Sequence, residues 1–265
     1  MTAQDTARKA GDSDALEHLA RVGLVAYGLV HLLVAWLALQ LAWFGSNGES
    51  ADQSGAMATL VEAPLGKPLL WVLALGLIAL AAWQAAEVLR WRSGWSASGK
   101  QRTKALRKSG NALIKAIIYV TVAVLAIRFA TGDRKSSSQS QQETTAGVFG
   151  WPGGQWLVGL AGLILIGVGA WHIRKGINKH FLKQIDTSGC APKAVTLVTR
   201  LGQIGFPGKG IALGGVGGLL VWAAVTFDPS KARGLDGAVN GALELPFGRI
   251  LLTVVAMGVA AFGAF

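Results

Sequence analysis

The sequence predicts an all-α membrane protein of six transmembrane helices, built as three parallel two-helix repeats. Three observations carry this prediction. The chain is 52% hydrophobic and only 15% charged, whereas soluble domains carry about 25% charged residues. Its apolar residues gather in long runs, and the runs recur at fixed distances along the chain.

Five apolar runs approach or exceed the roughly 20 residues that a helix needs to cross the hydrocarbon core. These uncharged runs are residues 22–48, 68–86, 144–173, 210–227 and 250–265. A further span is predicted over 110–131, although its uncharged centre covers only 116–127. Lys115 and Arg128 flank that centre and can extend their charged ends toward the headgroups. We therefore expect six spans.

The charge distribution predicts the orientation of these spans. The first twenty residues are polar, so no cleavable signal peptide is expected and the first span inserts by itself. The N-terminal arm and the loops around 90–110 and 174–203, with adjoining helix ends, hold 18 Lys and Arg against 6 Asp and Glu. The opposite side holds 7 against 8. The positive-inside rule then places the basic side and both termini in the cytoplasm, and explains most of the net charge of +11.

An internal repeat decides the architecture. Shifts of 88 and 182 residues superpose the chain on itself, with a Pro-x-Gly motif before each returning helix. The motif residues are Pro64, Gly66, Pro152, Gly154, Pro246 and Gly248. Proline costs no hydrogen bond in the first turn of a helix, so we expect it to open the returning helix there. Trp83, Trp171 and Phe265 follow seventeen residues after each glycine and are expected at the headgroup level.

Each repeat is expected to contain an outgoing helix, an outer loop and a returning helix. The predicted organisation is a cytoplasmic arm (1–19), repeat one (20–92), a basic loop (93–107), repeat two (108–180), a cytoplasmic loop (181–201) and repeat three (202–265), with a truncated last helix. Two spans per repeat make the repeats parallel, with symmetry along the membrane normal. A closed pseudo-threefold bundle and a side-by-side arrangement both remain open. The Ser- and Gln-rich segment 134–142 is expected to be flexible.

Several motifs together resemble a known family. They are Leu19-Ala20-Arg21-Val22-Gly23, Ala26-Tyr27-Gly28, Ser54-Gly55-Ala56, Glu62-x-Pro64-x-Gly66, and Leu69-Leu70-Trp71 leading to Trp83 and Glu87. In these motifs the chain is similar to domain-of-unknown-function family 1206, bacterial membrane proteins with a transmembrane helix pair repeated three times. The resemblance covers essentially the whole chain. It implies this architecture in the bacterial inner (cell) membrane, and no activity. The chain departs from the family pattern after Phe265, where equivalents of Glu87 and Arg90 are absent.

Polar residues within the spans form the first candidate site, because such residues are costly in lipid. The repeat aligns Tyr27, Lys115 and Lys209, and it places His31 and Tyr119 one turn deeper on the same helix faces. These five residues are predicted to line a cytoplasm-facing vestibule suited to an anionic substrate or a lipid phosphate. Alternatively, the lysines extend to the headgroups, and a neutral His31 bonds a neighbouring helix or relays protons.

A basic segment near the first cytoplasmic loop forms a second candidate site, for anionic lipid headgroups. Its residues are Arg90, Arg92, Lys100, Arg102, Lys104, Arg107 and Lys108. The alternative is that these charges only set the topology. Glu87 is expected to pair with Arg90 or another nearby base. Separately, Gly210, Gly214 and Gly218 form a small-residue face that should pack against a helix of the same chain.

The function class follows from what the sequence lacks. Cys190 is the only cysteine, which excludes an intrachain disulfide and a cysteine metal cluster. There is no phosphate loop, His-Glu-x-x-His motif or nucleophile elbow. We expect no metal, no cofactor, no nucleic-acid partner and no enzymatic activity. The favoured function is an accessory or scaffolding protein that binds lipid or a membrane protein partner; the alternative is a channel or transporter for a small solute, with anions among the candidates.

Overall fold

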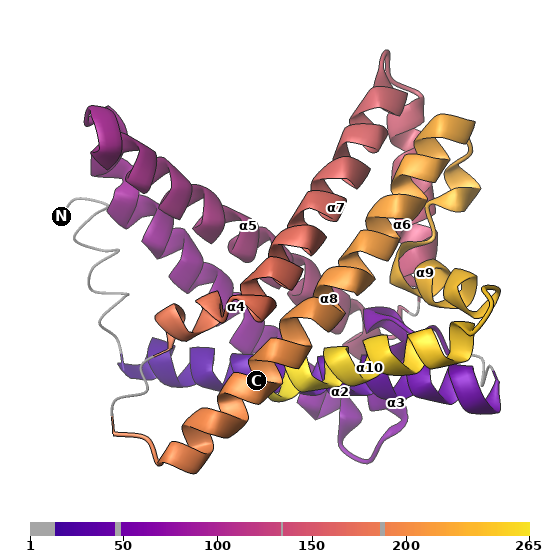
Figure 1. Cartoon of the computed structure of the whole chain (residues 1–265), viewed down its shortest axis with the longest axis horizontal. Coiled ribbons are helices and arrows are strands. Elements are labelled where there is room, and N and C mark those ends of the chain that lie inside the picture. Colours follow the sequence, from indigo (N-terminus) through magenta and orange to yellow (C-terminus); the bar gives the residue numbers. More distant parts are fainter. Residues whose placement is uncertain (1–13, 46–48, 134, 186–188) are drawn as a thin grey trace. The chain divides into compact units, whose positions relative to one another are not determined.

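The computed structural model describes residues 14–45, 49–133, 135–185 and 189–265, so most of the predicted N-terminal arm lies outside the described residues. The described residues form helices and no β-strand (Figure 1). The elements are α2 (Asp14–Phe44), α3 (Gln53–Glu62), α4 (Gly66–Trp91), η1 (Arg92–Ser96), α5 (Gly99–Ala130), α6 (Ser137–Phe149), α7 (Gly154–Ile177), η2 (His180–Gln184), α8 (Pro192–Thr226), η3 (Pro229–Lys231), α9 (Gly234–Leu243) and α10 (Gly248–Ala264).

Five helices within the described ranges are long and apolar enough to cross a membrane. Their apolar segments are Arg21–Phe44, Gly66–Ser96, Gly99–Ala130, Gly154–Ile177 and Pro192–Thr226. The span predicted over 110–131 is therefore part of a long helix. The sixth predicted span corresponds to α10, an apolar helix of 17 residues, about 26 Å long at 1.5 Å per residue. Six spans and a pseudo-threefold arrangement thus remain predictions.

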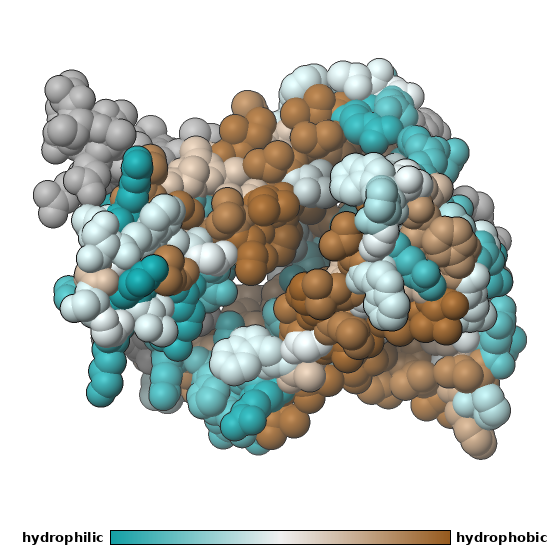
Figure 2. Space-filling view, turned by 90° about the horizontal axis from the view of Figure 1, so that it is seen from above, coloured by the Kyte–Doolittle hydropathy of each residue, from teal (hydrophilic) through white to brown (hydrophobic). Residues whose placement is uncertain are grey.

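Large apolar side chains are exposed along these helices. Val25 is 76% exposed, Trp156 82% and Val225 75%. Figure 2 shows hydrophobic residues over much of the visible face. Such surfaces are unfavourable in water but favourable against lipid chains. Together with the long apolar helices, they are the features of a multi-pass membrane protein.

The chain divides into two compact units. Unit 1 comprises residues 1–27 and 60–133, and unit 2 comprises residues 28–59 and 134–265. Helix α2 therefore supplies residues to both units, with the division after Tyr27, and α3 is divided after Thr59.

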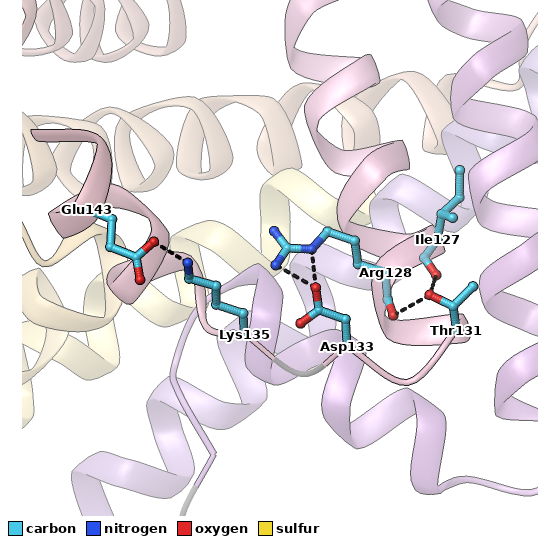
Figure 3. Close-up of polar contacts among 6 residues, drawn as sticks. All are labelled: Ile127, Arg128, Thr131, Asp133, Lys135 and Glu143. Carbon is cyan, nitrogen blue, oxygen red and sulfur yellow. Dashed lines mark hydrogen bonds and ion pairs between the residues drawn. The ribbon is translucent and has the colours of Figure 1, made fainter. Parts of the chain in front are cut away.

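In unit 1, η1 connects α4 to α5 in a helical hairpin. The indole Nε1 of Trp95 donates to Oγ of Ser109 at 3.0 Å, which ties the connection to the start of α5. At the other end of α5, Arg128 pairs with Asp133 at 2.7 Å, the contact drawn in Figure 3. Arg128 therefore has a carboxylate partner beside the span that it was predicted to flank.

In unit 2, α7 and α8 form a second hairpin that packs through glycines. A Cβ atom on Gly169 would lie 2.5 Å from the carbonyl oxygen of Gly210, and one on Gly162 would lie 2.7 Å from that of Gly217. The expected packing within the chain is confirmed for Gly210. The predicted four-residue spacing is wrong at Gly218, where an added Cβ would meet nothing within 4 Å. Within each helix the two contacting glycines are seven residues apart, Gly162 and Gly169 on α7 and Gly210 and Gly217 on α8. Seven residues make about two helical turns, so both glycines lie on the side that faces the other helix.

Short helices occupy the segments that were predicted as outer loops. α6 covers most of the segment that was expected to be flexible, so that expectation is wrong for the helical residues from Ser137 onward. Oγ of Ser136 accepts from the backbone N–H of Gln139 at 3.1 Å and caps the helix. Lys135 pairs with Glu143 beside it, as Figure 3 shows.

The Pro-x-Gly motif forms a turn before each returning helix. The backbone N–H of Gly66 donates to the carbonyl of Ala63 at 2.9 Å, and Leu65 has φ 63° and ψ 16°. Proline second and a left-handed residue third define a type II turn. Gly153 and Phe247 adopt the same conformation in the other copies. The proline thus lies two residues before the helix, which corrects the prediction that it occupies the first helical turn.

The glycine of this motif is required by close backbone contact. A Cβ atom on Gly66 would overlap the carbonyl oxygen of Leu60 at the end of α3. Likewise, Gly154 faces the carbonyl of Val148 and Gly248 that of Ala242. The same motif therefore reverses the chain in the same way in all three copies.

Candidate functional site

Lys209 and His31 meet inside unit 2. Nζ of Lys209 lies 3.4 Å from Nε2 of His31 and 3.9 Å from the ring centroid of Phe262. The imidazole of His31 also contacts the Phe262 ring, with centroids 5.3 Å apart. His31 is buried and Lys209 is partly buried. Three helices, α2, α8 and α10, therefore bring an ammonium group and an imidazole onto one aromatic ring.

Glycines bring these helices close enough for the contact. A Cβ atom on Gly205 would lie 2.6 Å from backbone atoms of Phe262, and one on Gly28 would lie 2.5 Å from the carbonyl oxygen of Gly263. A Cβ on Gly208 would similarly meet Gly258. Small residues at a helix interface allow such close packing in a membrane. They place both polar side chains within reach of α10.

A second lysine reaches the same aromatic cluster. Nζ of Lys175 lies 4.4 Å from the ring centroid of Phe206. The rings of Phe206 and Phe262 pack edge to face with centroids 5.4 Å apart, and Phe181 stacks on Phe206 at 5.2 Å. Ammonium groups over aromatic faces are stabilised by the ring quadrupole. We call Lys175, Lys209, His31, Phe206 and Phe262 the aromatic–lysine site.

The other predicted polar residues lie in unit 1. The rings of Tyr27 and Tyr119 meet edge to face, with centroids 5.9 Å apart. Lys115 is exposed on α5. Of the five predicted residues, the structure thus pairs Tyr27 with Tyr119 and His31 with Lys209, each within one unit. A single vestibule formed by all five stays a prediction.

The predicted headgroup-binding residues surround tryptophans at the α4–α5 connection of unit 1. Nζ of Lys108 lies 4.9 Å from the ring centroid of Trp91, and that of Lys104 lies 6.0 Å away. Trp91 donates from Nε1 to Glu87 at 2.7 Å. Glu87 also pairs with Arg90, which confirms the expected ion pair. The remaining predicted bases, Arg92, Lys100, Arg102 and Arg107, are exposed.

In unit 2 a buried carboxyl group caps α3, and a second carboxyl group joins the start of α3 to α9. Asp52 is 1% exposed, and its Oδ1 caps α3 by accepting from the backbone N–H groups of Ser54 at 2.8 Å and Gly55 at 3.1 Å. Asp236 of α9 accepts from the backbone of Ala51 at 3.0 Å. Burial raises the pKa of Asp52 above its usual value, and the neighbouring charge of Asp236 raises it further. Asp52 is the least exposed charged side chain of the described residues.

Sequence reasoning missed four of these residues: Lys175, Phe206, Phe262 and Asp52. Phe262 lies within an apolar run and Phe206 lies just before one, where an aromatic residue gives no separate signal. Asp52 precedes a short helix in the position of an N-cap, and this was the available signal. Among the residues that the structure describes, no group of three or more His, Cys, Asp or Glu side chains is arranged to hold a metal ion.

Comparisons with known proteins agree with the three copies. The model of the family described as Domain of Unknown Function (DUF1206) matches residues 22–90, 111–179 and 204–265. A protein of Bacillus subtilis (strain 168), named Uncharacterized protein YxxB, is 31% identical over 250 residues, which make up 94% of this chain and 88% of that protein. No solved structure matches the chain.

Proposed function

Because the chain belongs to the DUF1206 family and carries three copies of its domain, we propose that it is an accessory membrane protein that binds anionic phospholipid at the aromatic–lysine site. In this proposal all six predicted spans cross the bacterial inner membrane, and α10 is the sixth. The basic loops and both termini face the cytoplasm, in keeping with the positive-inside rule. The bound phospholipid then comes from the cytoplasmic leaflet.

One observation carries this proposal: two ammonium groups converge on one aromatic cluster. Lys175 lies over Phe206, Lys209 lies over Phe262, and the two rings are in contact. A phosphate group accepts charge-assisted hydrogen bonds from ammonium donors. Nε2 of His31 can accept from the Lys209 ammonium group beside it and so orient that group. Hydrocarbon and aromatic surfaces around the cations match the chains of a lipid better than a freely soluble anion.

The basic residues of unit 1 support a role at the same leaflet. Lys104 and Lys108 lie beside Trp91, and tryptophan and lysine together are typical of the headgroup region. Anionic lipid attracts such bases at about 1 kcal/mol each. The exposed bases would concentrate anionic lipid near the protein, and the aromatic–lysine site would select one molecule.

Native mass spectrometry of the full chain, released gently from its own membrane, tests the proposal. We expect a retained phospholipid with an anionic headgroup, and its loss from the Lys175→Met/Lys209→Met double variant. Methionine keeps an apolar stem on each ring and removes the charge. A chain retaining a small soluble anion would instead favour transport. A chain retaining only polypeptides would favour protein scaffolding.

A further inference from the structure

Unit 2 also contains an apolar groove in the third repeat, between α8, α9 and α10. Its volume is 450 Å³, within the range of about 300–1,000 Å³ that is usual for ligand sites. Along α8 it extends from Ile211 to Trp222, about 16 Å at 1.5 Å per residue. Leu251 and Val255 of α10 line the opposite side. The groove therefore runs lengthwise along a membrane span.

Small residues create this groove. Gly215 of α8 and Gly241 and Ala242 of α9 all line it. A Cβ atom on Gly241 would meet nothing within 4 Å. The repeat shift of 182 residues places Leu33 at the position of Gly215 and Thr59 at that of Gly241. The third copy is therefore open where the first copy carries larger side chains.

The lining of the groove favours a single hydrocarbon chain. All of its lining residues except Glu244 are uncharged, and most of them are Leu, Ile, Val, Ala or Gly. One wall is α8, which is long and apolar enough to cross a membrane, so the medium around the groove is hydrocarbon rather than water. A lipid chain is therefore the available occupant.

Charged groups lie at the α9 end of the groove. Trp222 lines the groove, and Nζ of Lys231 lies 5.0 Å from the centroid of its ring. Glu244 also lines the groove, in the turn after α9. A phosphate group would accept from Lys231, and a headgroup amine would donate to Glu244. An ethanolamine phospholipid carries both groups.

We propose that this groove binds one acyl chain of an ethanolamine phospholipid, with the headgroup beside Lys231 and Glu244. The chain end then lies near Ile211 and Val255. This site goes beyond the proposed function, because it uses different residues, takes a zwitterionic lipid and lies toward the α9 end of the third repeat.

Photochemical labelling tests the proposal. The full chain is reconstituted in vesicles that contain phosphatidylethanolamine with a diazirine near the end of one acyl chain. After illumination, labelled peptides are mapped by mass spectrometry. Gly241→Leu fills the groove. Gly147→Leu is the matched control, because Gly147 is the repeat equivalent on α6 and a Cβ there also meets nothing within 4 Å.

We expect the label from this lipid to concentrate near Ile211 and Val255. With a second lipid, whose diazirine lies close to the ester, the labelled residues should instead lie near Trp222. Gly241→Leu should reduce this label at least about fivefold, which corresponds to roughly 1 kcal/mol, and Gly147→Leu should leave it unchanged. If Gly241→Leu fails to fold, Ala242→Leu replaces it. Label spread evenly over all apolar helices, or unchanged in the filled variant, would overturn the proposal, as would cross-links from the groove to a second copy.

The Lys175→Met/Lys209→Met double variant separates this proposal from the proposed function. It should lose anionic lipid and keep the groove label. Loss of the groove label in that folded variant would show that the groove is not a separate site, and would overturn the inference.

Discussion

Nζ of Lys209 lies 3.4 Å from Nε2 of His31, although 178 residues separate them in the sequence. The contact joins the first and third repeats within unit 2 and lies against Phe262 of the last helix. Ionisable side chains inside apolar helices are energetically costly in lipid, so a lysine and a histidine in contact there indicate a functional site. The contact therefore provides the most direct link between the fold and a binding role.

Removing either partner should reveal coupling between them. We expect the double-mutant cycle of His31→Leu and Lys209→Met to give an interaction free energy of about 0.5–1.5 kcal/mol. The measurement is unfolding of the purified chain in one detergent, followed by circular dichroism. Additive effects of the two changes would contradict the contact.

Asp52 should make stability depend on pH. Its pKa is raised in the folded protein, above the value of about 3.9 in unfolded chains. The folded state therefore holds a proton that the unfolded state has released, and stability falls as pH rises from about 4 through the folded pKa. Asp52→Asn keeps an acceptor for the α3 cap and should flatten this fall when thermal unfolding is measured from pH 4 to 8.

Asp52→Ala provides the contrast for that prediction. It removes the charge and also the cap of α3, so it should lower stability by about 1 kcal/mol even at acidic pH. Equal pH profiles for the natural chain and Asp52→Asn would show that the carboxyl group does not titrate as described.

The turn glycines should tolerate no side chain. In Gly154→Ala the new Cβ overlaps the carbonyl oxygen of Val148, so α6 and α7 must move apart. We expect a loss of at least about 2 kcal/mol in unfolding free energy. Gly147→Ala, in the same helix pair, has open space at its Cβ and should be neutral or slightly stabilising. Equal effects of the two changes would argue against the turn geometry.

Glycine should be the most stable residue at the left-handed position of the turn. Leu65 is 76% exposed and has φ 63°, so it is strained and buries little surface. Left-handed backbone costs a residue with a side chain about 1–2 kcal/mol. Leu65→Gly should therefore raise the melting temperature, and Gly153→Leu should lower it. A lower melting temperature for both variants would contradict the assigned conformation.

The repeat made much of the fold predictable. Pro64, Gly66 and their equivalents repeat at fixed shifts, and the structure gives all three copies one turn. The exact role of the proline was missed, since a proline two residues before a helix and one in its first turn differ little in sequence. α6 was missed because Ser, Thr and Gly, which make up much of it, are weak helix formers, and its contacts with the rest of unit 2 outweigh that preference.

The candidate site was only partly predictable. Repeat alignment selected His31 and Lys209 because polar residues are conspicuous within apolar spans. It did not select Phe206 or Phe262. A phenylalanine that contacts a cation and a phenylalanine that faces lipid both have apolar neighbours in the sequence, so the sequence does not distinguish them. Nor did it predict which helices meet, because close packing at Gly205 and Gly208 depends on the three-dimensional register of α8 and α10.

Anionic lipid binding at Lys175 and Lys209 is tested most directly by a titration of the purified chain with short-chain phosphatidylglycerol. The natural chain is compared with Lys175→Met/Lys209→Met and with Lys67→Met/Arg249→Met, which removes two exposed bases on the side opposite the predicted cytoplasmic loops. We expect at least a tenfold weaker Kd, about 1.4 kcal/mol, for the first double variant and little change for the second. Equal affinities in all three proteins would contradict an anionic lipid site at Lys175 and Lys209.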